Sequence, residues 1–212
     1  MKDDNWDAIN GEAAHEIEVL NYSNQVNVIQ GLVHFLMHYH TDQSGACAVS
    51  PNENVLSEFH RTATLFLLNV PGAYRTEAVV VANGPTIIHR PPPHEEVPAR
   101  MQDFFNVLAQ NWQQASAQEI GAYCLWMINW VHPFKNGNGR TARAFCYACL
   151  CLKLGFVLPG ERTVIDLIMD QRAEYYAALK VADNAFEAGQ EPALEPMIAF
   201  VDRLLFDQLS SI

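Results

Sequence analysis

Apolar residues recur at helical spacing along most of the chain. Between Glu12 and Tyr39 they stand at Ile17, Leu20, Val28, Leu32 and Phe35, and this spacing is typical of an amphipathic helix. Ser50-Pro51 and Ser116 are residues that favour a helix start, so further helices are expected from about 50 to 69 and from 116 to 131. The remaining predicted helices cover 97–113, 138–154, 161–189 (as one helix or two) and 191–209.

One short segment has the composition of strands instead. Two β-branched runs, 78–82 and 85–89, flank Asn83-Gly84, and Asn-Gly between such runs strongly favours a two-residue hairpin turn. Prolines 91–93 end the second strand. We therefore predict an all-α fold with one small β-hairpin, built as a single domain over residues 1–212 with a short leader at 1–11.

Composition narrows the class of protein. Half of the 212 residues are hydrophobic, enough for a sizeable core, yet no run approaches the roughly 20 apolar residues of a membrane span. The net charge of −11 argues against non-specific binding to nucleic acid, which needs Lys and Arg to neutralise phosphates. Five cysteines, an odd number, indicate reduced thiols and a cytoplasmic location, in the producing cell or in another cell into which the protein is delivered as an effector.

The segment 132–143, His-Pro-Phe-Lys-Asn-Gly-Asn-Gly-Arg-Thr-Ala-Arg, is a polar loop between two strongly apolar helices. Its glycines, Gly137 and Gly139, allow backbone N–H groups to converge as an anion-binding nest at a helix N-terminus. Arg140 and Arg143 share one face of that helix and suit phosphate groups. His132 is a residue type that accepts protons near neutral pH. Together they indicate group transfer from a polyphosphate.

These residues resemble the signature of the Fic domain, His-x-Phe-x-(Asp/Glu)-Gly-Asn-Gly-Arg-x-x-Arg, at every fixed position except the acidic one, which is Asn136 here. The resemblance extends more weakly over about 16–205, including 16–22 and 171–179. It implies a Fic-type helical fold and transfer of AMP from ATP to a Ser, Thr or Tyr hydroxyl of a target protein. His132 is then the general base, and Gly137, Asn138, Gly139, Arg140 and Arg143 bind the ATP phosphates.

The resemblance also assigns roles outside the motif. The hairpin, residues 78–90, corresponds to the flap that holds the target segment beside the histidine. In one branch of the family an inhibitory motif, (Ser/Thr)-x-x-x-Glu-(Gly/Asn), precedes the first helix. Here 6–11 aligns with it, but Trp6 replaces the hydroxyl residue and Asn10 replaces the glutamate before Gly11. The segment is either a degenerate inhibitory motif or a plain leader, and a separate small antitoxin-like protein is a possible inhibitor.

Asn136 leaves the activity open. The acidic residue of the family binds Mg²⁺, and a neutral amide is a weaker ligand for a hard cation. Three outcomes follow: a slower AMP transferase, a Fic enzyme that transfers a different phosphate-linked group, or a catalytically impaired module that binds nucleotide or a protein partner. The first is the preferred interpretation, with ATP as substrate, Mg²⁺ as cofactor and Asn136 as a weak metal ligand.

Overall fold

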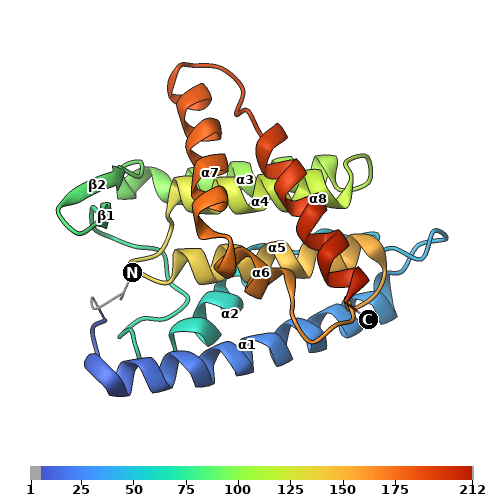
Figure 1. Ribbon diagram of the computed structural model, residues 1–212, viewed down its shortest axis with the longest axis horizontal. Helices are drawn as coiled ribbons and strands as arrows, with labels where there is room; N and C mark the ends of the chain where they lie inside the picture. The colour runs from blue at the N-terminus through green and yellow to red at the C-terminus, as the bar shows by residue number, and fades with distance from the viewer. Residues whose placement is uncertain (1–5, 212) are drawn as a thin grey trace.

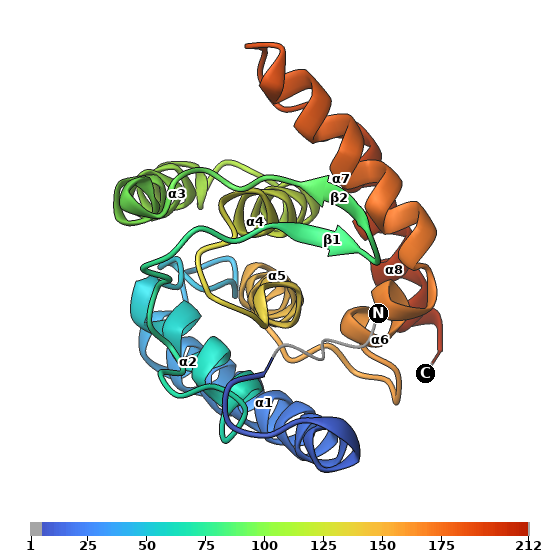
Figure 2. The same cartoon turned by 90° about the vertical axis from the view of Figure 1, so that its left-hand side faces the viewer.

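Helix α5 (Asn138–Leu154) lies at the centre of the molecule, and the other helices surround it (Figure 2). The computed structural model describes residues 6–211. Twelve of the seventeen residues of α5 are buried, because this helix is apolar or small on almost every face. It packs against α1 (Gly11–His40), α2 (Glu53–Thr64), α4 (Ala117–Val131) and α6 (Val164–Asp170). This arrangement puts the start of α5, and with it the glycine-rich loop, at one end of the helix cluster (Figure 1).

The remaining helices enclose α4. Helix α3 (Val97–Asn111) lies against it, preceded by a short 3₁₀ turn at His94–Glu96, and α7 (Arg172–Glu187) and α8 (Glu195–Ser210) cover another side (Figure 1). Ser116 caps α4 in a capping box with Glu119, as its sequence position predicted. The predicted all-α fold with one hairpin is confirmed over the described residues.

The hairpin pairs β1 (Val81–Asn83) with β2 (Thr86–His89) in antiparallel order. Asn83 pairs with Thr86, so Gly84 and Pro85 form the loop instead of the predicted Asn83-Gly84. Strand β1 begins at Val81 instead of the predicted Ala78, and a register irregularity lies between Val81 and Ala82. The hairpin spans the gap from α4 towards α7 on the side where the loop lies (Figure 2).

The residues of α1 that face the core are not all the apolar ones that the spacing in the sequence predicted. Leu20 and Phe35 are 63% and 57% exposed, whereas Asn21 and Gln25 are buried. The two amides donate hydrogen bonds to carbonyls of α2 and the residue after it: Asn21 to Leu65 at 2.9 Å, and Gln25 to Phe59 at 2.8 Å. Because these bonds satisfy the amides, polar residues can occupy a helix interface that periodicity assigns to apolar ones.

Two predicted helix boundaries were wrong. Helix α2 starts after Asn52, whose side chain accepts from two backbone N–H groups, and it ends at Thr64 instead of Asn69. The chain leaves the helix there because Leu67 and Leu68 bury against Trp6 and Ala14 in a small second core. The segment 161–189, predicted as one helix or two, is two helices, α6 and α7, separated at Gln171, and a capping box at Thr163 starts the first.

The five cysteines are buried free thiols, as expected. No helix within residues 6–211 combines the length and apolarity that crossing a bilayer requires. Of the predicted leader 1–11, residues 1–5 lie outside the described part. Of the rest, Trp6 is buried, at only 5% exposed, whereas Ala8, Asn10 and Gly11 are exposed.

Candidate active site

The loop between α4 and α5 begins and ends in left-handed backbone conformations. His132, the residue that ends α4, has φ 51° and ψ 58°. Gly137 has φ 78°, and a Cβ there would lie 2.6 Å from the Thr64 side chain, so only glycine fits. As the N-cap of α5, Gly137 has no side chain to accept from the N–H groups of Asn138 and Gly139. The helix N-terminus is therefore suited to an anion.

The loop is fixed from inside by Asn138. Its side-chain oxygen accepts from the backbone N–H of Phe134 and its amide donates to the Phe134 carbonyl, both at 2.8 Å. Asn138 is 1% exposed and Phe134 is fully buried. The sequence predicted that the Asn138 amide binds phosphate, but both of its polar groups are used inside the loop. In the structure this side chain therefore stabilises the loop.

His60, on α2, supports the same loop and was missed in the sequence. Its ring stacks on Phe134 with centroids 3.7 Å apart. Nδ1 accepts from the N–H of Gly72 at 2.8 Å, so Nε2 carries the proton that it donates to the Asn136 carbonyl at 2.9 Å. Burial lowers the pKa of His60 to about 4, which keeps the ring neutral. No sequence pattern marks this residue, because its partners are distant in the chain.

His132 is half-buried and neutral near pH 7. Burial lowers its pKa to about 4, and the nearby His89 and Arg75 act in the same direction. Nδ1 lies 3.4 Å from the Asn129 carbonyl, and a proton on Nδ1 leaves the Nε2 lone pair as the acceptor. A neutral imidazole is the form that accepts a proton. Phosphate anions bound beside it would raise its pKa towards the working range.

Arg140 is held by residues from the N-terminal part of the chain. Its Nη2 lies 3.1 Å from a carboxylate oxygen of Glu18 on α1, and its guanidinium lies 5.1 Å from the ring centre of Trp6. Trp6 donates from its indole N–H to the other oxygen of Glu18 at 2.8 Å. The sequence predicted neither Glu18 nor a contact between Trp6 and Arg140, so this cluster of Trp6, Glu18 and Arg140 is a finding of the structure.

Arg143 has a different environment from Arg140. Its Nε is buried and has no hydrogen-bond partner among the described residues, and its Nη1 lies close to Gly139. Burial lowers its pKa, and the phenol of Tyr175 acts in the opposite direction. Within residues 6–211 no carboxylate pairs with it. A buried guanidinium donor without a partner is costly, and an anion would satisfy it.

The N-terminal segment contacts the loop at a second point. Asp7 pairs with Lys135 at 2.6 Å, and the backbone N–H groups of Asp7 and Ala8 donate to the Leu67 carbonyl. Lys135 is exposed and paired. Asn10, which the sequence aligned with the inhibitory glutamate, is the N-cap of α1 and makes no side-chain cap bond.

The residues around Asn136 do not form a Mg²⁺ site by themselves. Its side-chain oxygen accepts from the N–H of Gly137 at 2.6 Å, and its carbonyl is bonded to His60. Among the described residues no three His, Cys, Asp or Glu side chains are gathered for a metal. One neutral amide oxygen is a poor donor set for a hard divalent cation.

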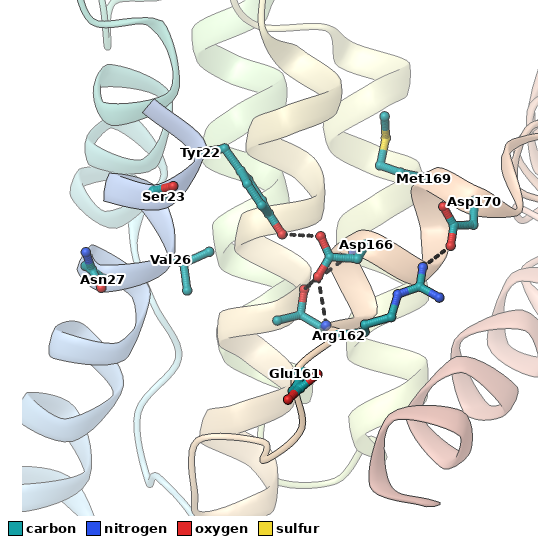
Figure 3. A pocket seen from close by; sticks show the side chains of 10 residues that line it. Tyr22, Ser23, Val26, Asn27, Glu161, Arg162, Asp166, Met169 and Asp170 are labelled. Carbon is teal, nitrogen blue, oxygen red and sulfur yellow. Dashed lines mark hydrogen bonds and ion pairs between the residues drawn. The ribbon is translucent and has the colours of Figure 1, made fainter. Parts of the chain in front are cut away.

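A pocket of about 630 Å³ lies elsewhere, between α1 and α6 (Figure 3). Several of its polar groups pair with one another: the Tyr22 hydroxyl donates to Asp166, and Arg162 pairs with Asp170. None of the residues of the 132–143 motif lines it, so we assign it no part in the site. The lining residues are Tyr22, Ser23, Val26, Asn27, Glu161, Arg162, Thr163, Asp166, Met169 and Asp170.

Comparison with known proteins agrees with this geometry. The model of the Fic/DOC family matches residues 50–150. A protein adenylyltransferase Fic from Nematostella vectensis is 29% identical over 133 residues, which are 62% of this chain and 27% of that protein. Protein adenylyltransferase fic-1 from Caenorhabditis elegans is 45% identical over 65 residues, 31% of this chain and 11% of that protein. This chain thus spans about a quarter or less of these relatives.

Among solved structures, a Fic domain containing signaling protein from Bacteroides thetaiotaomicron superposes with a TM-score of 0.65 at 18% identity, over 92% of this chain and 71% of that one. At this identity the likeness concerns the fold. In this chain the central α5, the hairpin beside the loop and the 132–143 motif occur together. The family match, the sequence relatives and the fold agree, and residues 50–150 of this chain belong to the Fic/DOC family.

Proposed function

We propose that this chain is a protein adenylyltransferase, which transfers AMP from ATP to a hydroxyl side chain of a target protein. Two features of the motif carry the proposal together. His132, at the start of the loop, is neutral, and Arg143, on α5 after the loop, has a buried Nε without a hydrogen-bond partner among the described residues. The names of the sequence relatives, both adenylyltransferases, support the same reaction.

In this reaction the target hydroxyl oxygen attacks the α-phosphorus of ATP. A bond forms between this oxygen and phosphorus, the bond from phosphorus to the bridging oxygen breaks, and pyrophosphate leaves. His132 Nε2 takes the hydroxyl proton, while Arg140, Arg143 and the N–H groups of Asn138 and Gly139 hold the phosphates. Such transfers depend chiefly on positioning and charge stabilisation, which this site's residues supply.

The hairpin at 78–90 is the proposed docking site of the target. Val80, Ile87 and Ile88 are 51%, 42% and 59% exposed on it. A two-stranded hairpin is marginally stable alone and has an edge to which an extended segment can pair. A target strand added there would lie beside the loop that carries His132.

The decisive experiment incubates the purified chain with ATP labelled at the α-phosphate, and separately at the γ-phosphate, together with Mg²⁺ and lysate proteins. We expect protein labelling from the α-label only, and its loss by about 10²–10⁴-fold in His132→Ala, as is usual when a general base is removed. Labelling from the γ-phosphate would show phosphate transfer instead. Competition by CTP, GTP and UTP identifies the nucleotide.

Asn136 favours one alternative, a module that binds nucleotide without turnover, because this residue lacks the metal-binding charge of the family. Calorimetry with ATP and Mg²⁺ beside the labelling assay separates the two. Binding without labelling of any protein, unchanged in Asn136→Asp, would establish the module and refute the enzyme.

A further inference from the structure

Arg75 lies between the hairpin and the loop and contacts both through backbone carbonyls. It precedes the hairpin, and its side chain is only 5% exposed. The last carbonyls of a helix lack partners within the helix. At the end of α4, Arg75 Nη2 donates to the Val131 carbonyl at 3.3 Å and Nε to the His132 carbonyl at 2.8 Å. The backbone N–H of Arg75 donates to the Pro133 carbonyl at 2.8 Å.

The same guanidinium holds both ends of the hairpin segment. Nη1 donates to the carbonyl of Glu77 at 3.1 Å, and Nη2 donates to the carbonyl of Pro92 at 2.6 Å. These carbonyls lie immediately before and shortly after residues 78–90. His89, at the end of β2, adds a contact of 2.8 Å between Nε2 and the Trp130 carbonyl of α4.

No carboxylate within residues 6–211 forms an ion pair with Arg75. Burying a charge is costly unless it is well hydrogen-bonded, and here carbonyl oxygens accept all the hydrogen bonds of the guanidinium. The negative end of the α4 dipole favours a cation at this point. If the side chain at this position only had to fill space, an apolar residue would be sufficient. The multidirectional hydrogen bonding of this arginine instead fixes four carbonyls relative to one another.

We propose that Arg75 is a positioning residue, which sets the distance between a target segment on the hairpin and the His132 imidazole by holding both hairpin ends and the left-handed turn at His132. The inference rests on the proposed function. Arg75 touches no reacting atom in this role. It acts through the backbone of His132 and of the hairpin, and a misplacement of about 1 Å in such a site can cost on the order of 100-fold in rate.

The test compares Arg75→Lys and Arg75→Met with the control Arg61→Met. Arg61 is an exposed arginine of α2 that pairs with Glu58 at 3.2 Å. Lysine keeps the charge but offers only a point donor in place of a planar fork, so it cannot reach all four carbonyls. Hydrogen exchange by mass spectrometry, thermal unfolding, calorimetric ATP affinity and transfer kinetics are measured on the whole chain of each variant.

In Arg75→Met we expect faster exchange in 77–92 and in 130–134 together, with exchange in α5 and α8 unchanged. Transfer to the target should fall about tenfold or more, while ATP affinity stays within about twofold. Arg75→Lys should give the same pattern with a smaller loss, and Arg61→Met should match the wild type. Equal losses of exchange protection, melting temperature and ATP affinity across the whole chain would mean that Arg75 serves general stability, and would overturn the proposal.

The transfer activity and the role of Arg75 can be disproved independently. If the wild-type chain transfers nothing, the proposed function is wrong, but the exchange measurement still tests whether Arg75 couples the hairpin to the loop. If exchange in 77–92 and 130–134 is unaffected by Arg75→Met while the wild type is active, the coupling is wrong and the proposed function stands.

Discussion

At the scale of single residues, His132 and His60 both have a lowered pKa, although only His132 could be identified from the sequence. His132 belongs to the motif and His60 does not, yet burial lowers the pKa of both to about 4. In the unfolded chain a histidine titrates near 6.5. Between about pH 4 and 6.5 the unfolded state therefore binds more protons than the folded state.

We accordingly predict that the protein loses stability as the pH falls from about 6.5 to 4. Stability rises with pH wherever the unfolded state binds more protons, so the free energy of unfolding should change by about 1.4 kcal/mol per pH unit for each of the two histidines. Urea unfolding across this range measures it. His60→Gln, which keeps a donor towards Asn136, should reduce the slope by about half. The control His15→Gln, at an exposed position on α1, should not change the slope.

Asn136 is the residue at which this chain departs from the motif. Asn136→Asp would place a carboxylate where the amide oxygen now accepts from Gly137, a bond that a negative charge strengthens. We predict a lower Mg²⁺ concentration for half-maximal transfer and a rate increase of about tenfold at limiting Mg²⁺. A Mg²⁺ titration of both proteins measures this, and identical titration curves would show that the metal is held without residue 136.

At the scale of elements, the start of α5 depends on the conformation of one glycine. Gly137→Ala would force a Cβ into the left-handed region and to within 2.6 Å of Thr64. We expect a loss of about 1–3 kcal/mol of stability from the strain alone, and weaker ATP binding because the α5 N-terminus moves. Chemical unfolding and calorimetry measure the two effects.

A second glycine provides the control. Gly31 lies within α1 at a negative φ, and a Cβ added to it would have no neighbouring atom within 4 Å. Gly31→Ala should therefore stabilise the protein by about 0.5–1 kcal/mol and leave ATP binding unchanged. Destabilisation by both substitutions to the same extent would show that the conformation at Gly137 is not special.

At the scale of the whole molecule, the N-terminal segment, α1 and α5 meet at Arg140. Glu18 and Trp6 contact the guanidinium that the proposed function assigns to a phosphate. We predict that Trp6→Ala and Glu18→Gln each increase ATP affinity about two- to fivefold, in line with the roughly 0.5–1 kcal/mol of such contacts. Calorimetry measures the change. Glu16→Gln, an exposed neighbour on α1, is the matched control, and weaker ATP binding in the two test variants would mean that the cluster helps to hold nucleotide.

The sequence alone determined the helices, the hairpin and the 132–143 motif, because helical periodicity, caps, an Asn-Gly turn and a contiguous signature are all local features. Local patterns could not determine where α2 ends, since Leu67 and Leu68 leave the helix to bury against Trp6. They also could not reveal Arg75, His60 or Glu18 as partners of the loop. Each of these contacts joins residues more than 50 positions apart, and only the packing of α1, α2 and α4 around α5 brings them together.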